Sequence, residues 1–209
     1  MQFTSEKLWQ PVLDFWFEDG IELGWPSHNM GELWFGGRPG LDEQIREQFE
    51  PLVEAALWSE LVEWEEKPLS RVALLVLLDQ FTRNIYRGEG RAFSGDHRAV
   101  TLVMEGVARG MDELLPWVAR VFFYMPLMHA EDLALQDESV SCFTRLVAAA
   151  EKDGAKTIAD KMRGNLGHAI EHREVIVRFG RFPHRNAALG RESTEEELEY
   201  LTTSGRYGQ

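Results

Sequence analysis

The stretch PLSRVALLVLLDQFTR, residues 68–83, decides the fold class of this chain. Its apolar run, VALLVLL at 72–78, fits either a buried strand or part of a buried helix, because periodicity does not separate the two in a short run. Pro68 suits the first turn of a helix, and the LDQFTR flank makes the segment longer than a typical strand. We therefore predict a buried helix. Seven apolar residues are also too few for a membrane span, which needs about 20.

Apolar residues at helical spacing continue outward in both directions from this segment. Residues 19–40 are the exception, because glycines and prolines interrupt them. We expect a loop there whose Trp25, Trp34 and Phe35 pack against the protein as a strap. No strand pair or hairpin turn is evident. The pattern predicts one all-α domain over residues 1–209, built as an array of antiparallel helix pairs with about eight helices: 11–18, 42–57, 68–83, 96–109, 112–126, 128–152, 155–179 and 193–201.

Composition and local motifs argue against several classes of function. With 35 acidic and 22 basic residues the formal net charge is −13, which opposes binding to nucleic-acid phosphates. Cys142 is the single cysteine and cannot form an internal disulfide, and the N-terminal MQFTSEKLWQ lacks a signal-peptide pattern, so we expect a cytoplasmic protein. GEGRAF at 88–93 lacks the third glycine of a dinucleotide fingerprint, and no phosphate loop is present, so we expect no cofactor.

Positive charge is nevertheless concentrated in RFGRFPHRNAALGR, residues 178–191. Three further segments combine polar and aromatic residues: 78–93, 94–99 and 126–136. Their arginines outnumber their acids, so unpaired guanidiniums remain if the segments converge. Because a planar guanidinium can hold carboxylate or phosphate through two hydrogen bonds, this pattern predicts a concave anion site. The residues expected to bind the ligand are Asp79, Arg83, Asn84, Arg87, Asp96, His129, Arg178, Arg181, His184, Arg185 and Asn186.

The same residues also fit a structural network, in which arginines bind helix carbonyls and acids. The sequence leaves both interpretations open. In the binding interpretation, acids orient the arginines and aromatic residues wall the pocket; the acids are Asp79, Asp96 and Glu131, and the aromatics are Trp16, Trp34 and Phe35.

The phrase HAIEH at 168–172 matches H-x-x-E-H, in which two histidines one turn apart hold zinc and a glutamate acts as base. No acid-rich helix identifies a third ligand, and two histidines at this spacing occur by chance on polar helix faces. We therefore expect no metal.

A proton-transfer pair is a further hypothesis. His129 with Glu131, or His184 with a facing carboxylate, could form one, because histidine as a residue type changes charge near neutral pH and a carboxylate orients its ring. Alternatively, His129 simply hydrogen-bonds at a helix start after Pro126. No G-x-S-x-G motif supplies a nucleophile, and Cys142 is expected to be buried. The catalytic candidates are thus His129, Glu131 and His184, and the sequence leaves open whether the protein is an enzyme.

These segments resemble the uncharacterised, mostly bacterial family catalogued as domain of unknown function 924. The matching stretches are VLDFWF (12–17), WF (34–35), LLDQFTRNIYRG (77–88), AFSGD (92–96), FFYMPLMHAEDLALQ (122–136) and HREVIVRFGRFPHRNAALGRESTEEELEYL (172–201). The resemblance implies an all-helical fold related to the tetratricopeptide-repeat superfamily, although no fixed period of about 34 residues is visible. It implies no activity, substrate or cofactor. The family-like pattern begins at His172, which leaves His168 outside and makes the HAIEH match incidental.

The resemblance also associates one polar set that core packing alone does not explain: Asp79, Gln80, Arg83, Asn84, Tyr86, Arg87, Asp96, His129, Glu131, Gln136, His172, Arg178, Arg181, His184, Arg185 and Asn186. The leading hypothesis is a protein whose Arg83, Arg87, Arg178, Arg181 and Arg185 bind an anionic small molecule or an acidic peptide end. One alternative is a hydrolase that uses a histidine–carboxylate pair while arginines hold an anionic substrate. Another is a purely structural scaffold for protein interactions.

Overall fold

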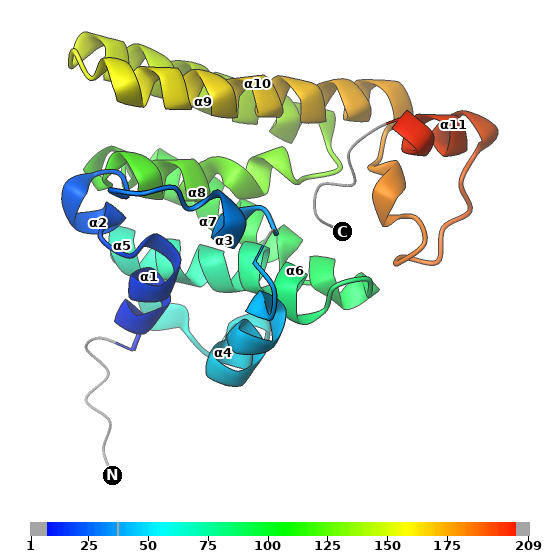
Figure 1. The fold of residues 1–209 in the computed structure, drawn as a ribbon, viewed down its shortest axis with the longest axis horizontal. Coiled ribbons are helices and arrows are strands. Elements are labelled where there is room, and N and C mark those ends of the chain that lie inside the picture. Colours follow the sequence, from blue (N-terminus) through cyan, green and yellow to red (C-terminus); the bar gives the residue numbers. More distant parts are fainter. Residues whose placement is uncertain (1–7, 37, 204–209) are drawn as a thin grey trace.

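The computed structural model describes residues 8–36 and 38–203, and every regular element within these ranges is helical (Figure 1). This confirms the all-α prediction. The α-helices are α1 (Gln10–Phe17), α2 (Gly20–Leu23), α3 (Gly31–Trp34), α4 (Leu41–Leu57), α5 (Pro68–Leu75), α6 (Thr82–Ile85), α7 (Asp96–Ala108), α8 (Trp117–Met128), α9 (Leu133–Lys152), α10 (Lys156–Phe179) and α11 (Glu195–Thr203). Short 3-10 turns are η2 (Val62–Glu65), η4 (Gly90–Phe93), η5 (Asp112–Leu114) and η6 (Pro183–Arg185).

The segment 68–83 is the buried helix that the sequence predicts, with one feature that it does not predict. Between α5 and α6 the chain forms a π-helical turn, η3 (Val76–Phe81). Such wider turns are rare and are often found at functional sites. Every residue from Ser70 to Thr82 is buried, and the apolar members are 0–1 % exposed. The apolar run is continuous because neighbours cover the helix on all sides.

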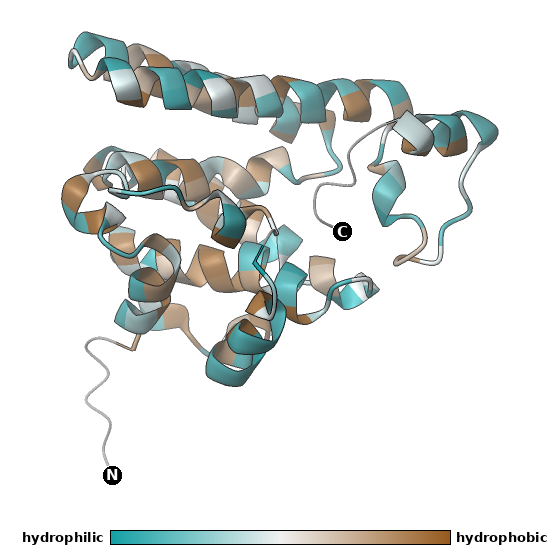
Figure 2. Cartoon of the chain, in the orientation of Figure 1, coloured by the Kyte–Doolittle hydropathy of each residue, from teal (hydrophilic) through white to brown (hydrophobic). Residues whose placement is uncertain are grey.

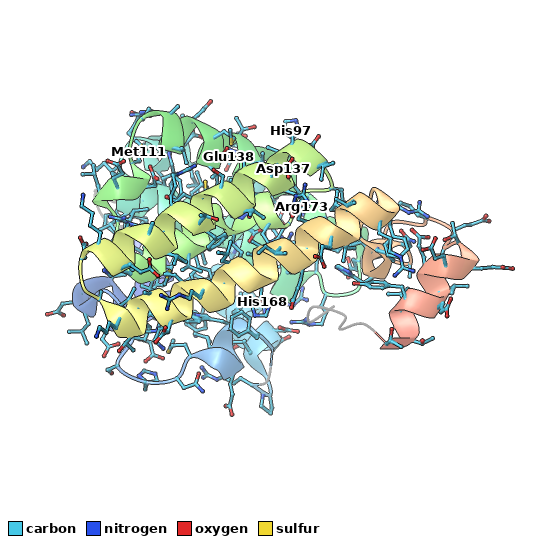
Figure 3. The ribbon with its side chains drawn as sticks, turned by 90° about the horizontal axis from the view of Figure 1, so that it is seen from above. His97, Met111, Asp137, Glu138, His168 and Arg173 are labelled. Atoms are coloured by element: carbon cyan, nitrogen blue, oxygen red, sulfur yellow. The ribbon has the colours of Figure 1, made fainter. Side chains whose placement is uncertain are left out.

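The remaining helices form layers on either side of this central segment. In Figure 1, α9 and α10 lie along one side of the molecule, α8 lies next to them, and α5, α6 and α4 lie beyond α8. Seen from above in Figure 3, α9 and α10 run side by side and antiparallel. Gly154, with a φ of 71°, makes the turn between them, and an ion pair between Arg173 and Asp137 joins them further along. The α10 helix of this hairpin forms one wall of the cavity described below.

Apolar residues of α1, α4, α5, η3, α7, α8, α9 and α10 form the main core. Figure 2 colours the hydrophobic residues of these helices brown. A second, smaller cluster lies at the end of α10, where Val175, Ile176 and Phe182 pack with Phe179 and Tyr200. No described helix is long and apolar enough to cross a membrane.

The glycine-rich segment 19–40 is only partly the loop that the sequence predicts, because it contains α2 and α3. It does pack as a strap: Trp34 Nε1 donates to the carbonyl of Trp16 at 2.9 Å, and Trp25 lies edge-to-face against Trp34. Phe35 departs from the prediction, since 67 % of it remains exposed. Residue 37, which belongs to this segment, and residues 1–7, which carry part of the signal-peptide prediction, lie outside the described residues.

Several predicted helix ends are wrong by a few residues. Helix α4 begins at Leu41, directly after Gly40, whose φ is 74°, rather than at residue 42. Pro126 does not end α8, which continues to Met128, and α9 begins at Leu133 after an Asp132 N-cap. The last helix begins at Glu195 rather than at residue 193, and it is capped by Thr194 and Glu197.

Candidate functional site

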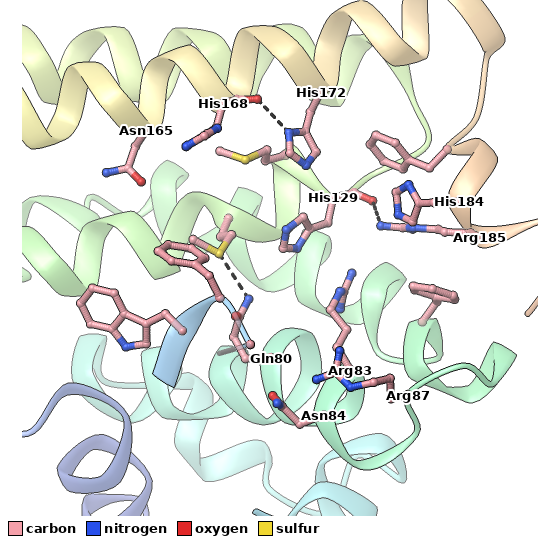
Figure 4. Close-up of a pocket in the computed structure, with 17 residues that line it drawn as sticks. Gln80, Arg83, Asn84, Arg87, His129, Asn165, His168, His172, His184 and Arg185 are labelled. Atoms are coloured by element: carbon pink, nitrogen blue, oxygen red, sulfur yellow. Dashed lines mark hydrogen bonds between the residues drawn. The ribbon is translucent and has the colours of Figure 1, made fainter. Parts of the chain in front are cut away.

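A cavity of about 270 Å³ lies between α10 and the η3–α6 segment (Figure 4). It is slightly smaller than the pockets that hold drug-sized molecules, at about 300–1,000 Å³. Its walls come from segments that are far apart in the sequence, and the lining residues are Trp34, Phe35, Gly36, Gln80, Arg83, Asn84, Arg87, Phe93, Met125, Met128, His129, Asn165, His168, His172, Phe182, His184 and Arg185. The loop after α6 and the connector after α10 therefore meet around one hollow.

The floor of the cavity is a polar stripe on η3 and α6. Gln80 of η3 and Arg83 and Asn84 of α6 line the cavity, and Arg87 extends this lining into the turn after α6. Gln80 Nε2 contacts the sulfur of Met125 at 3.3 Å, which joins the floor to α8 (Figure 4). This arrangement explains why polar residues follow the apolar run at 72–78. The apolar run packs in the core, whereas the polar residues after it line the cavity.

His129, at the end of α8, is oriented by the carboxylate of Asp79. Its Nδ1 lies 2.8 Å and 3.0 Å from the two carboxylate oxygens. Asp79 is 1 % exposed. Burial alone would raise the pKa of Asp79, but the charges of Arg83 and His129 hold it well below its usual range, so the carboxyl is an anion at neutral pH. Because a carboxylate only accepts hydrogen bonds, Nδ1 carries a proton that it donates.

Arg83 and Arg185 share the carboxylate of Asp96. Arg83 Nη2 lies 2.9 Å from one oxygen, and Arg185 Nη1 lies 3.1 Å from the other. Arg83 also contacts Asp79 at 3.2 Å, and Arg185 Nη2 donates to the carbonyl of His129 at 2.8 Å (Figure 4). These contacts fix both guanidiniums beside His129.

The rest of the environment of Arg185 is apolar. Its guanidinium stacks between the rings of Phe93 and Phe182, at 4.5 Å and 4.7 Å from their centroids. Burial, and then the charge of Arg83, lower the pKa of Arg185 to about 10, which still leaves it a cation near neutral pH. Its Nε has no acceptor among the described residues. The protein thus holds a desolvated positive charge at the edge of the cavity.

Two other histidines of the cavity are uncharged at neutral pH. Burial, and then the charge of His129, lower the pKa of His172 to about 3. Burial, and then the charge of Arg185, lower the pKa of His184 to about 3 as well. His172 Nδ1 donates to the carbonyl of His168 at 2.8 Å (Figure 4). Both rings therefore contribute polar but neutral surface.

Comparison with known proteins places the chain in a family. The family described as "Bacterial protein of unknown function (DUF924)" matches residues 12–205. The chain belongs to the DUF924 family. This confirms the resemblance that the sequence segments carry.

A solved structure supports the same placement. A protein of unknown function from Agrobacterium tumefaciens is 36 % identical to this DUF924 member, with a TM-score of 0.72. The match covers 94 % of this chain and 98 % of that one. No curated protein matches the chain.

One expectation about the arginines of this DUF924 member is wrong. The sequence suggests that unpaired guanidiniums remain when the polar segments meet. In the structure a carboxylate partner is present for each of seven arginines: Arg83, Arg87, Arg91, Arg178, Arg181, Arg185 and Arg191. Four of the partners come from outside those segments: Asp42 for Arg87, Glu54 for Arg91, Glu196 for Arg178 and Glu197 for Arg181. Asp96 serves Arg83 and Arg185, and Glu131 serves Arg191. Counting charges within segments fails because distant helices supply the acids.

Several sequence-predicted site residues do not line the cavity. Arg178 and Arg181 bind acids of α11, and Asn186 Nδ2 donates to Ser193 and Glu197. Their contacts fasten α11 to the connector between α10 and η6. Trp16, expected in the pocket wall, is a core residue with 1 % exposure, whereas Trp34 and Phe35 do line the cavity.

Glu131 also lies outside the lining and does not pair with His129. It accepts two hydrogen bonds from Arg191, at 2.6 Å and 2.8 Å, and one from the backbone amide of Phe182 at 2.7 Å. Burial would raise the pKa of Glu131, but these bonds keep it below its usual range. Its observed contacts tie the C-terminal connector to the junction of α8 and α9.

Sequence reasoning missed part of the cavity on α10. Asn165, His168 and His172 lie on one helix face, three and four residues apart, and all three line the cavity. The HAIEH match drew attention to two of them for zinc. Within the described residues no group of three His, Cys, Asp or Glu side chains is arranged to hold a metal ion. The sequence signal that could have identified this wall of the cavity is the helical spacing of Asn165, His168 and His172.

Proposed function

We propose that the cavity binds a small molecule with a negatively charged end and an apolar body. The observation that carries this proposal is the sign of the charge on its walls. The lining includes Arg83, Arg87 and Arg185, and of the described residues no aspartate or glutamate lines it. The carboxylates that pair with these arginines belong to Asp42, Asp79 and Asp96, none of which lines the cavity.

A bound ligand is therefore closer to the cations than to their partners. Since the Coulomb energy falls with distance, an anion that contacts the guanidiniums is attracted by them more strongly than it is repelled by the carboxylates, which do not line the cavity. The ion pairs also fix the guanidiniums before the ligand arrives, so little side-chain entropy is lost on binding. Pairing with carboxylates therefore fixes the positions of the arginine side chains and cancels only part of their attraction for an anion.

The apolar body of the ligand is supported by the other walls. Trp34, Phe35, Phe93, Met125 and Met128 contribute aromatic rings and thioethers. Small-molecule sites commonly combine such surfaces with a few polar groups that fix orientation. An acidic peptide end would have to fit the same volume of about 270 Å³.

Two probes with the same apolar body and opposite charges test the proposal. We expect 3-phenylpropionate to raise the melting temperature and to bind in isothermal titration, whereas 3-phenylpropylamine does neither. Arg87→Gln should weaken binding of the acid about tenfold, as for loss of one hydrogen bond to a charged group. Arg178→Gln is the matched control, because it removes the same charge from an exposed site outside the cavity. Equal binding of the acid and the amine would contradict the proposal.

The hydrolase alternative has one specific observation in its favour. A histidine whose Nδ1 donates to a buried carboxylate has the arrangement of a general base with its orienting partner. Asp79, not Glu131, fills that role here. If the protein is an enzyme, His129→Gln should abolish turnover while it retains binding of the anionic end.

The scaffold alternative is favoured by the complete pairing of the seven arginines. As part of this alternative we propose that the helix pairs stack in an array of the tetratricopeptide type, a form that suits a scaffold. It predicts that Arg181→Ala and Arg185→Ala unfold the protein without changing affinity for any small anion.

A further inference from the structure

We propose that the ligand is a 2-hydroxy acid with an apolar side chain, and that its hydroxyl group donates a hydrogen bond to Nε2 of His129. This inference rests on the proposed function, since it assumes that the arginines hold the carboxylate. It goes further by assigning a second polar group to the ligand and the protein atom that recognises it.

The first step is the tautomer of His129. Nδ1 is committed to the carboxylate of Asp79 at 2.8 Å, so in the neutral ring Nδ1 carries the proton and Nε2 has a lone pair. Nε2 has no partner among the described residues, and it is not sealed off from solvent. Because the ring lines the cavity, Nε2 is an acceptor available to a bound molecule.

The second step is the distance between this acceptor and the cations. Arg83 and His129 contact the same carboxylate of Asp79, and Arg185 Nη2 donates to the carbonyl of His129 at 2.8 Å. A carboxylate held by these guanidiniums therefore lies next to the imidazole. A hydroxyl on the carbon next to the carboxylate is a donor that stays close to these guanidiniums, and we assign it to Nε2.

The third step concerns the charge of the donor. An ammonium group could also donate to Nε2, as in an amino acid. In this cavity, however, it would lie among Arg83, Arg87 and Arg185 with no carboxylate in the walls of the described structure, and like charges repel. A neutral hydroxyl avoids this repulsion. The charge of the walls thus favours a hydroxy acid over an amino acid.

Three acids with the same phenyl body test the inference in the unmodified protein: 3-phenyllactate, 3-phenylpropionate and phenylalanine. Titrations are run at about pH 8, where histidine side chains are ordinarily neutral. We expect 3-phenyllactate to bind about tenfold more tightly than 3-phenylpropionate, because a site with an acceptor for a hydroxyl discriminates against the analogue that lacks it. Phenylalanine should bind more weakly than both.

Two variants connect this preference to His129. His129→Asn removes the imidazole acceptor, so the advantage of 3-phenyllactate should disappear while the affinity for 3-phenylpropionate changes by less than about threefold. Asp79→Asn offers an amide donor to Nδ1, which reverses the tautomer and makes Nε2 a donor. Asp79→Asn should therefore also abolish the tighter binding of 3-phenyllactate, and it replaces His129→Asn as the test if that variant does not fold.

The outcomes distinguish the two proposals. If both acids bind the unmodified protein equally, the hydroxy-acid inference is overturned and the anion site remains. If neither binds, both proposals fail. A preference for 3-phenyllactate that survives in both variants would also overturn the assignment to His129.

Discussion

The guanidinium of Arg185 lies 3.1 Å from the carboxylate of Asp96, 89 residues earlier in the chain. This contact joins the connector after α10 to the first turn of α7. Since Asp96 also holds Arg83, one carboxylate fixes two cations that line the same cavity. The geometry of the site therefore depends on a residue that does not itself line the cavity.

We predict that Asp96→Asn lowers the free energy of unfolding by about 3 kcal/mol, because it leaves two largely buried guanidiniums without their shared counter-charge. The side chain of Arg185 is 6 % exposed and that of Arg83 is 12 % exposed. Urea denaturation measures the change. The matched control is Glu66→Gln, which makes the same replacement in an exposed ion pair with Arg109, also at 3.1 Å. The control should lose less than about 1 kcal/mol, and a loss equal to that of Asp96→Asn would show that burial of the network is not what matters.

Gly95, next to Asp96, should tolerate no side chain. A β-carbon at this position would overlap the carbonyl oxygen of Leu78, in the backbone of η3, which a neighbouring rotamer cannot relieve. We expect Gly95→Ala to lower the free energy of unfolding by about 1–3 kcal/mol, as overpacking of a core does. It should also weaken binding of 3-phenylpropionate, because α7 must move and Asp96 moves with it.

Gly164→Ala on α10 provides the comparison for this substitution. Nothing lies within 4 Å of the added carbon, and the residue is helical and exposed, so the variant should gain about 0.5–1 kcal/mol. Chemical denaturation of the two variants gives opposite signs if this account is right. The same sign for both would contradict it.

The fold could be predicted where local chemistry decides it. The run at 72–78 is buried from every side, and the spacing in α9 and α10 gives their lengths to within a few residues. The π-turn η3 could not be predicted, because a wider hydrogen-bonding pattern is selected by what the helix packs against. The same is true of the cap at Thr194, where Arg181 and Asn186 bind Glu197 and so choose the register.

The candidate site could be predicted as a set of segments but not as a set of contacts. Asp42 stands at the start of the helix predicted at 42–57, and in the structure it is the partner of Arg87, with one pair of atoms 2.6 Å apart. His129 looked like a partner of Glu131, two residues away, and instead contacts Asp79, 50 residues away in the chain. Sequence spacing reveals which side chains share a helix face, whereas ion pairs between helices depend on how those helices pack.

Acid should destabilise the fold through the buried histidines. The folded-state pKa of His172 is lowered to about 3, below the ordinary value of about 6.5 that applies to the unfolded chain. Between these values the unfolded state binds more protons, so stability is complete above about pH 6.5 and is lost as the pH falls toward about 3. His172→Gln retains a donor for the carbonyl of His168 but removes the titration. From about pH 7.5 to about pH 5, the unmodified protein should therefore lose about 2 kcal/mol more than this variant, as measured by urea denaturation at each pH. His97→Gln, which removes an exposed ring, is the control and should follow the unmodified protein; parallel pH curves for all three would mean that His172 is not held neutral by its burial.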